Sequence, residues 1–417
     1  MVAIAQLVEH LIVVQKVARS SRVGHPSKTL PFAEGFCFFS LNSPLLGYRP
    51  NRHAGNHRVV HSGHIQFTEH KDKRSVMLSF ENDYSRAAHP AVLEAVAEAN
   101  NHLYSGYGSD ELSDQAKAKI REACGQPDAD VWFLVGGTQT NQTVIDTMLA
   151  PYEGVVTVDS GHPNVHEAGA IESTGHKVIT LPHHAGKLDA AELDDYCATF
   201  YADDNHEHMV FPGLVYISHP TEYGTIYGKA ELEAIAETAH RHGMPLFVDG
   251  ARLGYGLTAA GTDVTLPDLA RIADVFYIGG TKVGALFGEA VVFTKGNTPK
   301  HFLTQIKQHG ALLAKGWLLG LQFGTLFTDD LYLRIAANAN RQADRIREAL
   351  RERGYTLTFE APTNQVFVTL DHPTIERLQA HVRMGFMEKA DNEHTVMRLC
   401  TSWATTDEQV DQLIALL

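Results

Sequence analysis

Two residues with reactive side chains stand directly after short apolar segments of the chain. The segment 246–249 ends on Asp249, and the segment 275–279 is followed by a Gly-Thr turn and Lys282. Short apolar segments next to glycine are typical of buried parallel strands, and the functional groups of open α/β sheets gather just beyond the carboxyl ends of such strands. We therefore expect this carboxylate and this amine at one edge of one sheet.

Pyridoxal phosphate (PLP) requires both groups, a lysine amine that forms a Schiff base and an acid that pairs with the pyridine nitrogen. Lys282 has apolar and glycine neighbours and no acid before Glu289, and apolar surroundings favour the unprotonated amine. Asp249 ends an apolar strand, where an acid is costly without a positive partner. The alternatives are a solvated lysine in a glycine turn, and an acid that caps a helix or pairs with Arg252. Arg252 itself can contact phosphate or substrate.

Further polar groups follow other predicted strands. Gly137 and Thr138 lie in a turn between a strand and a helix, where backbone N–H groups and a hydroxyl can hold phosphate, although such turns are common. His162 follows the strand 155–159 and can stack on a flat cofactor or move a proton, but it is one of 24 histidines. Arg398, flanked by apolar residues, can clamp a carboxylate or be an edge-strand charge.

The elements that position these groups alternate between strand and helix. This alternation predicts an α/β fold with a mostly parallel sheet covered on both faces, in a large domain over 77–329. A small α+β domain is expected over 330–417. Strands are predicted at 131–135, 155–159, 177–181, 214–218, 246–249, 275–279, 289–294, 355–359, 365–370 and 396–402, and helices at 90–102, 137–149, 163–172, 189–196, 229–242, 301–327, 329–353, 373–381 and 406–417.

The composition, 44% apolar and 20% charged, is that of an ordinary globular protein. A net charge of −14 argues against nucleic acid or an anionic membrane as the main partner. The four cysteines are scattered without a CxxC pair, which predicts free thiols in a reducing, cytoplasmic compartment. The apolar segments all fall short of the roughly 18 residues that a membrane-spanning helix needs.

Residues 1–76 differ from the remainder in charge. They contain ten basic and four acidic residues, whereas residues 77–417 contain 25 basic and 45 acidic residues. Glu9 and His10 before the short apolar patch 11–14 argue against a secretory signal, whereas a transit peptide fits the basic, acid-poor composition. We favour a third interpretation, in which this stretch is a reading frame carried through a transfer-RNA gene. The working chain would then start at Met77 after a disordered extension. A chain that starts at Met77 and is inactive, while the longer form works, would contradict this.

Seven motifs resemble, in their order, those of the low-specificity L-threonine aldolases, within the β-eliminating lyase group of fold-type-I PLP enzymes. The resemblance covers nearly all of 77–417 and implies the aspartate aminotransferase-like fold. The Val-Asp-Gly-Ala-Arg box with its downstream lysine is the most specific part. The motifs are Asn82-Asp83-Tyr84, Tyr107-Gly108, Gly137-Thr138-Gln139, His162 with Glu167-Ala168-Gly169, Asp249-Gly250-Ala251-Arg252, Thr281-Lys282 and Thr363-Asn364.

The resemblance implies a role for each matching residue in binding the cofactor. Lys282 would hold PLP as a Schiff base, and Asp249 would pair with its pyridine nitrogen. His162 would stack on the ring, while Gly137 and Thr138 would hold the phosphate.

Other positions carry implied contacts with substrate or with a neighbouring subunit. Arg252 and Arg398 would meet the substrate carboxylate region. Lys315 stands where family members place an arginine that reaches the phosphate of a neighbouring subunit, so the charge is kept and the guanidinium fork is lost. Glu222 stands where many aldolases have a histidine near the substrate hydroxyl, which leaves substrate preference and the reaction open.

The implied reaction cleaves a β-hydroxy-α-amino acid to glycine and an aldehyde, with His162, directly or through water, as the base. The family also implies a homodimer or homotetramer with shared active sites. A lyase of the same fold that releases ammonia and pyruvate is the nearest alternative. A phosphate-binding protein that uses the glycine turn without PLP is another, and the intact Asp249 and Lys282 argue against a non-catalytic subunit.

Overall fold

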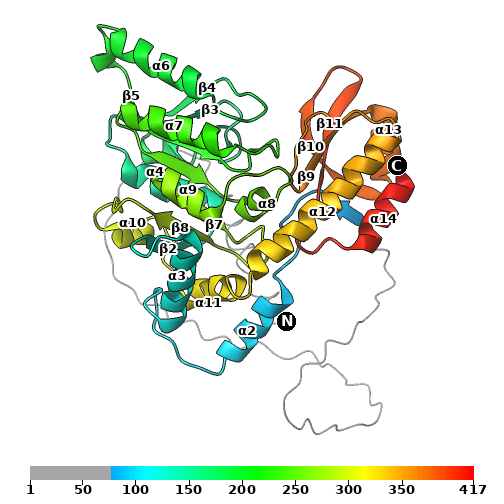
Figure 1. Cartoon of the computed structure of the whole chain (residues 1–417), viewed down its shortest axis with the longest axis horizontal. Coiled ribbons are helices and arrows are strands. Elements are labelled where there is room, and N and C mark those ends of the chain that lie inside the picture. The colour runs from blue at the N-terminus through cyan, green and yellow to red at the C-terminus, as the bar shows by residue number, and fades with distance from the viewer. Residues whose placement is uncertain (1–76) are drawn as a thin grey trace, which may run out of the picture. The chain divides into compact units, whose positions relative to one another are not determined.

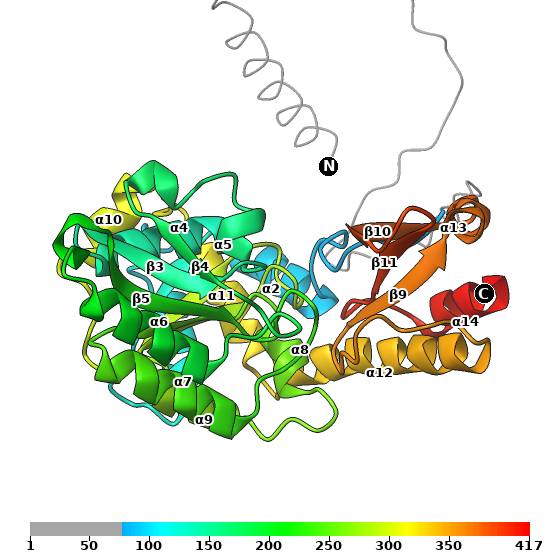
Figure 2. The ribbon, with the colours of Figure 1, turned by 90° about the horizontal axis from the view of Figure 1, so that it is seen from above.

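The computed structural model of the protein describes residues 77–417, which belong to one compact unit. The predictions for residues 1–76 and for Cys37 lie outside the described residues. Within 77–417 the chain forms a larger and a smaller sheet, and the long helix α12 (Leu331–Glu352) runs from the helices of the larger sheet to the smaller one (Figures 1 and 2).

The larger sheet has the strand order β2-β8-β7-β6-β5-β3-β4. The central strands pair in parallel, and β8 is antiparallel to both of its neighbours. The predicted mostly parallel sheet is therefore confirmed. The strands are β2 (Asp130–Leu134), β3 (Glu153–Val158), β4 (Val178–Leu181), β5 (Phe211–Ser218), β6 (Leu246–Asp249), β7 (Val275–Gly279) and β8 (Glu289–Phe293).

Helices cover both faces of this sheet because successive side chains of each strand point to opposite faces. In β6, Val248 packs into one core layer and Phe247 into the other. The Phe247 face is covered by α4 (Gly137–Met148) and α10 (Phe302–Gln308). The Val248 face is covered by α2 (Pro90–Ala99), α3 (Glu111–Cys124), α6 (Ala190–Ala202), α7 (Lys229–Arg241), α8 (Leu253–Leu257), α9 (Leu266–Ile272) and α11 (Trp317–Leu326).

The smaller sheet has the order β1-β10-β11-β9, with β1 parallel to β10 and the other pairs antiparallel. Apolar residues of α12, α13 and α14 form a core against it. Because β1 joins this sheet, the start of the described chain is tied to its C-terminal part, and the predicted domain division at residue 330 stays a prediction. The elements are β1 (Leu78–Phe80), β9 (Gln365–Asp371), β10 (Val382–Lys389), β11 (His394–Cys400), α13 (His372–Gln379) and α14 (Asp407–Leu416).

Several predicted elements were wrong. The helix expected at 163–172 is only α5 (His162–Val165) and the 3-10 turn η1 (Glu172–Thr174), because Ala168 and Gly169 adopt positive φ angles between them. The helix expected at 301–327 is divided into α10 and α11. The strand expected at 355–359 is a single bridge, Leu357 to Val368, and strands β1 and β10 were missed.

The cysteines of the described part, Cys124, Cys197 and Cys400, are buried and free, as the sequence predicts. Burial raises the pKa of the Cys124 and Cys400 thiols to about 12, so neither is a reactive thiolate at neutral pH. Among residues 77–417, no helix is both long and apolar enough to cross a membrane.

The turns after β6 and β7 approach each other closely at the edge of the sheet. A Cβ on Gly250 would lie 1.9 Å from the backbone oxygen of Tyr277, and a Cβ on Gly279 would lie 2.3 Å from that of Ala251. Only glycine permits such contacts between backbones. The two turns that carry Asp249 and Lys282 are therefore packed directly against each other.

Candidate active site

One cavity at the carboxyl edge of the larger sheet contains most of the predicted site residues. Its walls come from the turns that follow β2, β3, β5, β6 and β7, where a parallel sheet gathers its functional groups. The cavity contains five predicted residues, Gly137, His162, Asp249, Arg252 and Lys282, and is also lined by Ser218, Pro220, Thr221, Glu222, Ala251 and Tyr277.

Asp249 is buried at the end of β6 and accepts three hydrogen bonds. The Tyr216 hydroxyl donates to Oδ2 over 2.5 Å, the Asn141 amide donates to Oδ2 over 3.0 Å, and the Ala251 N–H donates to Oδ1 over 2.8 Å. Burial opposes ionisation, but the charge of His162 and these donors outweigh it, so the pKa of Asp249 lies below its ordinary value. The carboxylate is ionised at neutral pH, as the partner of a protonated pyridine must be.

Lys282 lies in the turn after β7, and this turn is held by a buried acid. Glu289, the first residue of β8, accepts hydrogen bonds from the Thr281 hydroxyl over 2.8 Å and from the Gly280 N–H over 3.1 Å. Burial lowers the pKa of Lys282, and the charge of Arg252 lowers it further, against the attraction of the nearby carboxylates. The lowered pKa favours the free amine that attacks an aldehyde.

His162 is the first residue of α5 and is held by two carboxylates. Its Nδ1 lies 2.7 Å from Oε1 of the buried Glu167, and its backbone N–H donates to Oε1 of Glu222 over 3.1 Å. Because an ionised carboxylate only accepts hydrogen bonds, Nδ1 is the donor in the first contact. Asn141 also donates to Glu167, over 2.7 Å, and so links the His162 pair to Asp249.

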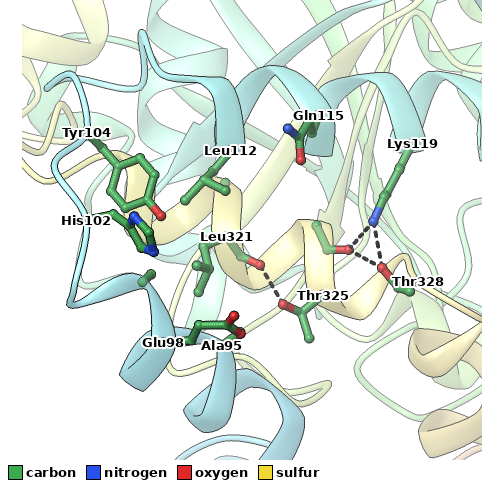
Figure 3. A pocket seen from close by; sticks show the side chains of 13 residues that line it. Ala95, Glu98, His102, Tyr104, Leu112, Gln115, Lys119, Leu321, Thr325 and Thr328 are labelled. Atoms are coloured by element: carbon green, nitrogen blue, oxygen red, sulfur yellow. Dashed lines mark hydrogen bonds between the residues drawn. The ribbon is translucent and has the colours of Figure 1, made fainter.

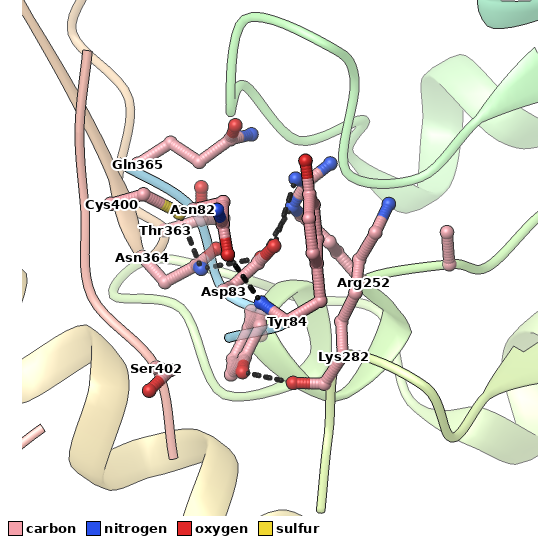
Figure 4. Close-up of polar contacts among 12 residues, drawn as sticks. Asn82, Asp83, Tyr84, Arg252, Lys282, Thr363, Asn364, Gln365, Cys400 and Ser402 are labelled. Carbon is pink, nitrogen blue, oxygen red and sulfur yellow. Dashed lines mark hydrogen bonds and ion pairs between the residues drawn. The ribbon is translucent and has the colours of Figure 1, made fainter. Parts of the chain in front are cut away.

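Arg252 forms a buried ion pair with Asp83, a contact that the sequence analysis did not predict. Its Nε donates to one carboxylate oxygen over 2.7 Å and its Nη2 to the other over 3.1 Å. Asn364 donates to the same carboxylate over 2.9 Å, so Asp83 lies between Asn364 and Arg252 (Figure 4). Burial would raise the pKa of Asp83, but Arg252 and Lys282 outweigh it and lower that pKa to about 2.

We expect Asp83→Asn to lower the free energy of unfolding by about 3 kcal/mol near pH 7, because it leaves the Arg252 charge buried without its partner. A depressed pKa contributes stability above the ordinary value of 3.8 that is lost as the pH falls towards about 2. The difference in the free energy of unfolding between variant and wild type, measured from denaturant unfolding curves, therefore shrinks as the pH falls over that interval. Glu233→Gln, which breaks an exposed pair with Arg271, is the control and has a much smaller effect.

Three predicted site residues do not line this cavity. Arg398 on β11 donates to the Gln365 side chain over 3.2 Å and to a backbone oxygen over 3.1 Å. Thr138 lies on the first turn of α4 and is exposed, although its neighbour Gly137 lines the cavity. Lys315 is exposed in the loop before α11. The structure thus brings five of the eight predicted residues together.

A second hollow lies between α2, α3 and α11 and contains none of the predicted residues (Figure 3). Lys119 crosses it to donate to the Gly324 carbonyl over 3.0 Å and to the Thr328 hydroxyl over 2.6 Å. The amine is therefore already paired within the chain. The acid of this hollow, Glu98, and its lysine, Lys119, do not follow strands of the larger sheet, unlike the acid and the lysine of the first cavity.

The sequence analysis missed three polar residues that support the site, Asn141, Tyr216 and Glu289. Asn141 lies four positions after Gly137, so helical spacing places the two on one face of α4. Tyr216 and Ser218 alternate along β5, and Ser218 pairs in register with Asp249. The spacing along the chain could therefore have identified Asn141 and Tyr216. Glu289, in contrast, reaches the Lys282 turn only through the pairing of β8 with β7.

The residues of the cavity fit PLP. The first N–H groups of α4 have no side-chain cap from Gly136, so they are available to a phosphate. The buried Tyr277 hydroxyl lies 3.3 Å from where a Cβ on Gly137 would be, and it has no hydrogen-bond partner within 77–417. Hydrogen-bond donors for a phosphate and an ionised Asp249 in the same cavity suit the phosphate and the pyridine nitrogen of this cofactor.

An α/β fold with a buried lysine and a buried acid at the strand ends defines the class of fold-type-I PLP enzymes. The sequence model of the β-eliminating lyase family matches residues 83–373. The chain belongs to this family, and the predicted PLP cofactor and carbon–carbon lyase class are confirmed with it.

Particular relatives cover most of the chain. The low-specificity L-threonine aldolase of Pseudomonas aeruginosa is 30% identical over 80% of this chain and 95% of its own length. The low-specificity L-threonine aldolase of a Pseudomonas species is 29% identical over 81% of this chain and 96% of its own length. The threonine aldolase structure from Leishmania major has a TM-score of 0.79 and is 42% identical, and the match covers 81% of this chain and 98% of that one. The aspartate aminotransferase of Thermus thermophilus, at 17% identity over 82% and 90%, has a TM-score of 0.59 and shares the predicted fold.

Proposed function

We propose that the protein is a PLP-dependent aldolase that cleaves L-threonine, L-allo-threonine and related β-hydroxy-α-amino acids to glycine and an aldehyde. One observation carries this proposal. Lys282 and Asp249 line a single cavity. The chain that carries them is similar to low-specificity L-threonine aldolases over nearly the whole length of those enzymes. When bound, PLP supplies the electron sink for the electron pair released at the substrate Cα.

The chain's own residues would hold the cofactor in the following way. The Lys282 amine would bind its aldehyde, and the Asp249 carboxylate would keep its pyridine nitrogen protonated. The N–H groups at Gly137 and Thr138 would donate hydrogen bonds to the phosphate. The His162 ring, with Nδ1 held by Glu167, would lie against the face of the cofactor.

The substrate carboxylate needs an arginine, and the structure favours Arg398 over Arg252 for this contact. The Arg252 guanidinium is already engaged by both oxygens of Asp83. The Arg398 guanidinium makes only single hydrogen bonds, and its buried Nε has no partner among the described residues. A carboxylate held by two parallel hydrogen bonds would orient the bond to be broken.

β-Elimination by the same scaffold is the second candidate, because the cavity has Glu222 where many aldolases have a histidine. The test is product analysis with L-threonine, L-allo-threonine and L-serine in the presence of PLP. We expect acetaldehyde and glycine in equal amounts from the two threonines. Pyruvate or 2-oxobutyrate with ammonia as the main products would overturn the aldolase proposal.

The proposal extends to assembly and location. We propose a homodimer or homotetramer in which Lys315 of one subunit reaches the phosphate in another, acting in cytoplasmic glycine and threonine metabolism. The position of Lys315 supports this, since it is exposed and lies outside the cavity of its own chain. Sedimentation velocity of the purified protein would test the assembly.

A further inference from the structure

Glu222 lines the active-site cavity, and the roles proposed above leave it without a function. It lies in the loop that follows β5, four residues after Ser218. Its Oε1 accepts two hydrogen bonds, from the Ser218 hydroxyl over 2.6 Å and from the His162 backbone N–H over 3.1 Å. Both of these hydrogen bonds are made to Oε1, and neither is made to Oε2. One oxygen is thus fixed, and the other is free to bind a ligand.

The surroundings of Glu222 suit a group that exchanges a proton. Burial raises the pKa of Glu222, and the charge of Asp249 adds to this, whereas the Ser218 hydrogen bond and the charge of His162 oppose it. The remaining charged groups of the cavity, Arg252 and Lys282, form no ion pair with it. The hydroxyls of Tyr216, Tyr223 and Tyr227 lie within reach of its charge. A carboxyl group whose pKa is raised towards neutral pH is an effective general base.

We propose that Glu222 accepts the proton of the substrate β-hydroxyl, an inference that rests on the proposed aldolase function. The hydroxyl proton passes to Oε2, and the O–H electron pair forms the aldehyde carbonyl as the Cα–Cβ bond breaks. The electron pair of that bond stays at Cα, where a proton is added to give glycine. One proton leaves and one is added, so L-threonine is converted to glycine and acetaldehyde without any other reactant.

A structural role for Glu222 is the competing explanation, because its Oε1 also holds the His162 backbone. The two explanations differ for a reaction that uses the same cofactor and no hydroxyl, the exchange of the glycine α-hydrogen in deuterated water. A base for the hydroxyl is needed only for cleavage. A residue that merely positions His162 would affect cleavage and exchange together.

We expect Glu222→Gln in the holoenzyme to lower kcat/KM for L-threonine cleavage by about 100-fold. Glycine exchange should fall by less than about threefold, since exchange involves no hydroxyl and does not need the base that is lost. The acidic limb of the kcat/KM profile should also disappear. A parallel loss of both reactions, or an unchanged acidic limb, would overturn the proposal. Absence of aldehyde release by the wild type would instead contradict the aldolase function itself, before any variant is compared.

Ser218→Ala provides a second test that retains Glu222. Removing a donor to the charged carboxylate raises its pKa, so the acidic limb should move to higher pH by about one unit. Infrared difference spectra of the holoenzyme provide a readout independent of turnover. A protonated-carboxyl band that titrates together with the acidic limb in the wild type should be missing in Glu222→Gln, whereas the band of Glu289, whose pKa burial raises to about 8, should remain. Identical spectra of wild type and variant, or an unmoved limb in Ser218→Ala, would contradict the assignment.

Discussion

Lys282→Ala is expected to abolish aldehyde release, by a factor on the order of 10⁴ or more. The variant lacks the amine that binds the cofactor, and Lys282 is the lysine that lines the cavity among residues 77–417. The visible absorbance of bound PLP in the purified protein should be lost at the same time. The measurements are acetaldehyde release from L-threonine and the absorbance spectrum after dialysis.

Lys300→Ala is the matched control for this experiment, because Lys300 is exposed and lies outside the cavity. It should retain both the activity and the absorbance of the wild type. Circular dichroism would show that Lys282→Ala remains folded. A Lys282→Ala protein that keeps the PLP absorbance and cleaves L-threonine at the wild-type rate would refute the assignment of this lysine.

Asp249→Asn is expected to lower kcat by about 10²- to 10³-fold, because a neutral amide cannot stabilise a protonated pyridine nitrogen. The Tyr216 hydroxyl and the Asn141 amide both donate to Asp249, so an amide –NH₂ at this position would also meet a donor. Steady-state kinetics at saturating PLP would measure the effect on kcat separately from any loss of cofactor affinity.

Asp83→Asn is the matched control, because Asp83 is also a buried carboxylate near Lys282 but lies outside the cavity lining. It should be destabilised yet retain much more of its kcat than Asp249→Asn. The low pKa of Asp249 means that its charge is constant across neutral pH, so the loss in Asp249→Asn should not depend on pH there. Equal losses in kcat for the two variants would contradict a special role for Asp249.

Much of the larger sheet could be predicted because its signals are local. The strands β6 and β7 are uninterrupted apolar segments next to glycine, and the structure ends them within a residue of the predicted positions. The groups after such strands share an edge, since parallel strands point the same way. This geometry brought Asp249 and Lys282 to one cavity. The helix expected at 163–172 failed because periodicity does not reveal that Ala168 takes a positive φ angle.

The roles of the arginines could not be predicted in this way, because they depend on partners far along the chain. Arg252 is 169 residues from Asp83, and Asn364 is 281 residues from it, yet the three share one buried network. Arg252 was predicted as a cofactor or substrate ligand, and that role stays a prediction. A buried guanidinium pairs with whichever carboxylate the fold supplies. Here that carboxylate is Asp83, in the loop that follows β1 of the smaller sheet.

The amino-acid sequence alone determined the sheet, its order of strands and helices along the chain, and the two reactive groups at its carboxyl edge. These follow from apolar segments and glycine turns that act over a few residues. Only the tertiary structure decided which acids hold His162, that Arg252 is already paired, and that Glu222 keeps one oxygen free in the cavity. Such contacts join residues that are distant in sequence, and their energies depend on burial that no local pattern encodes.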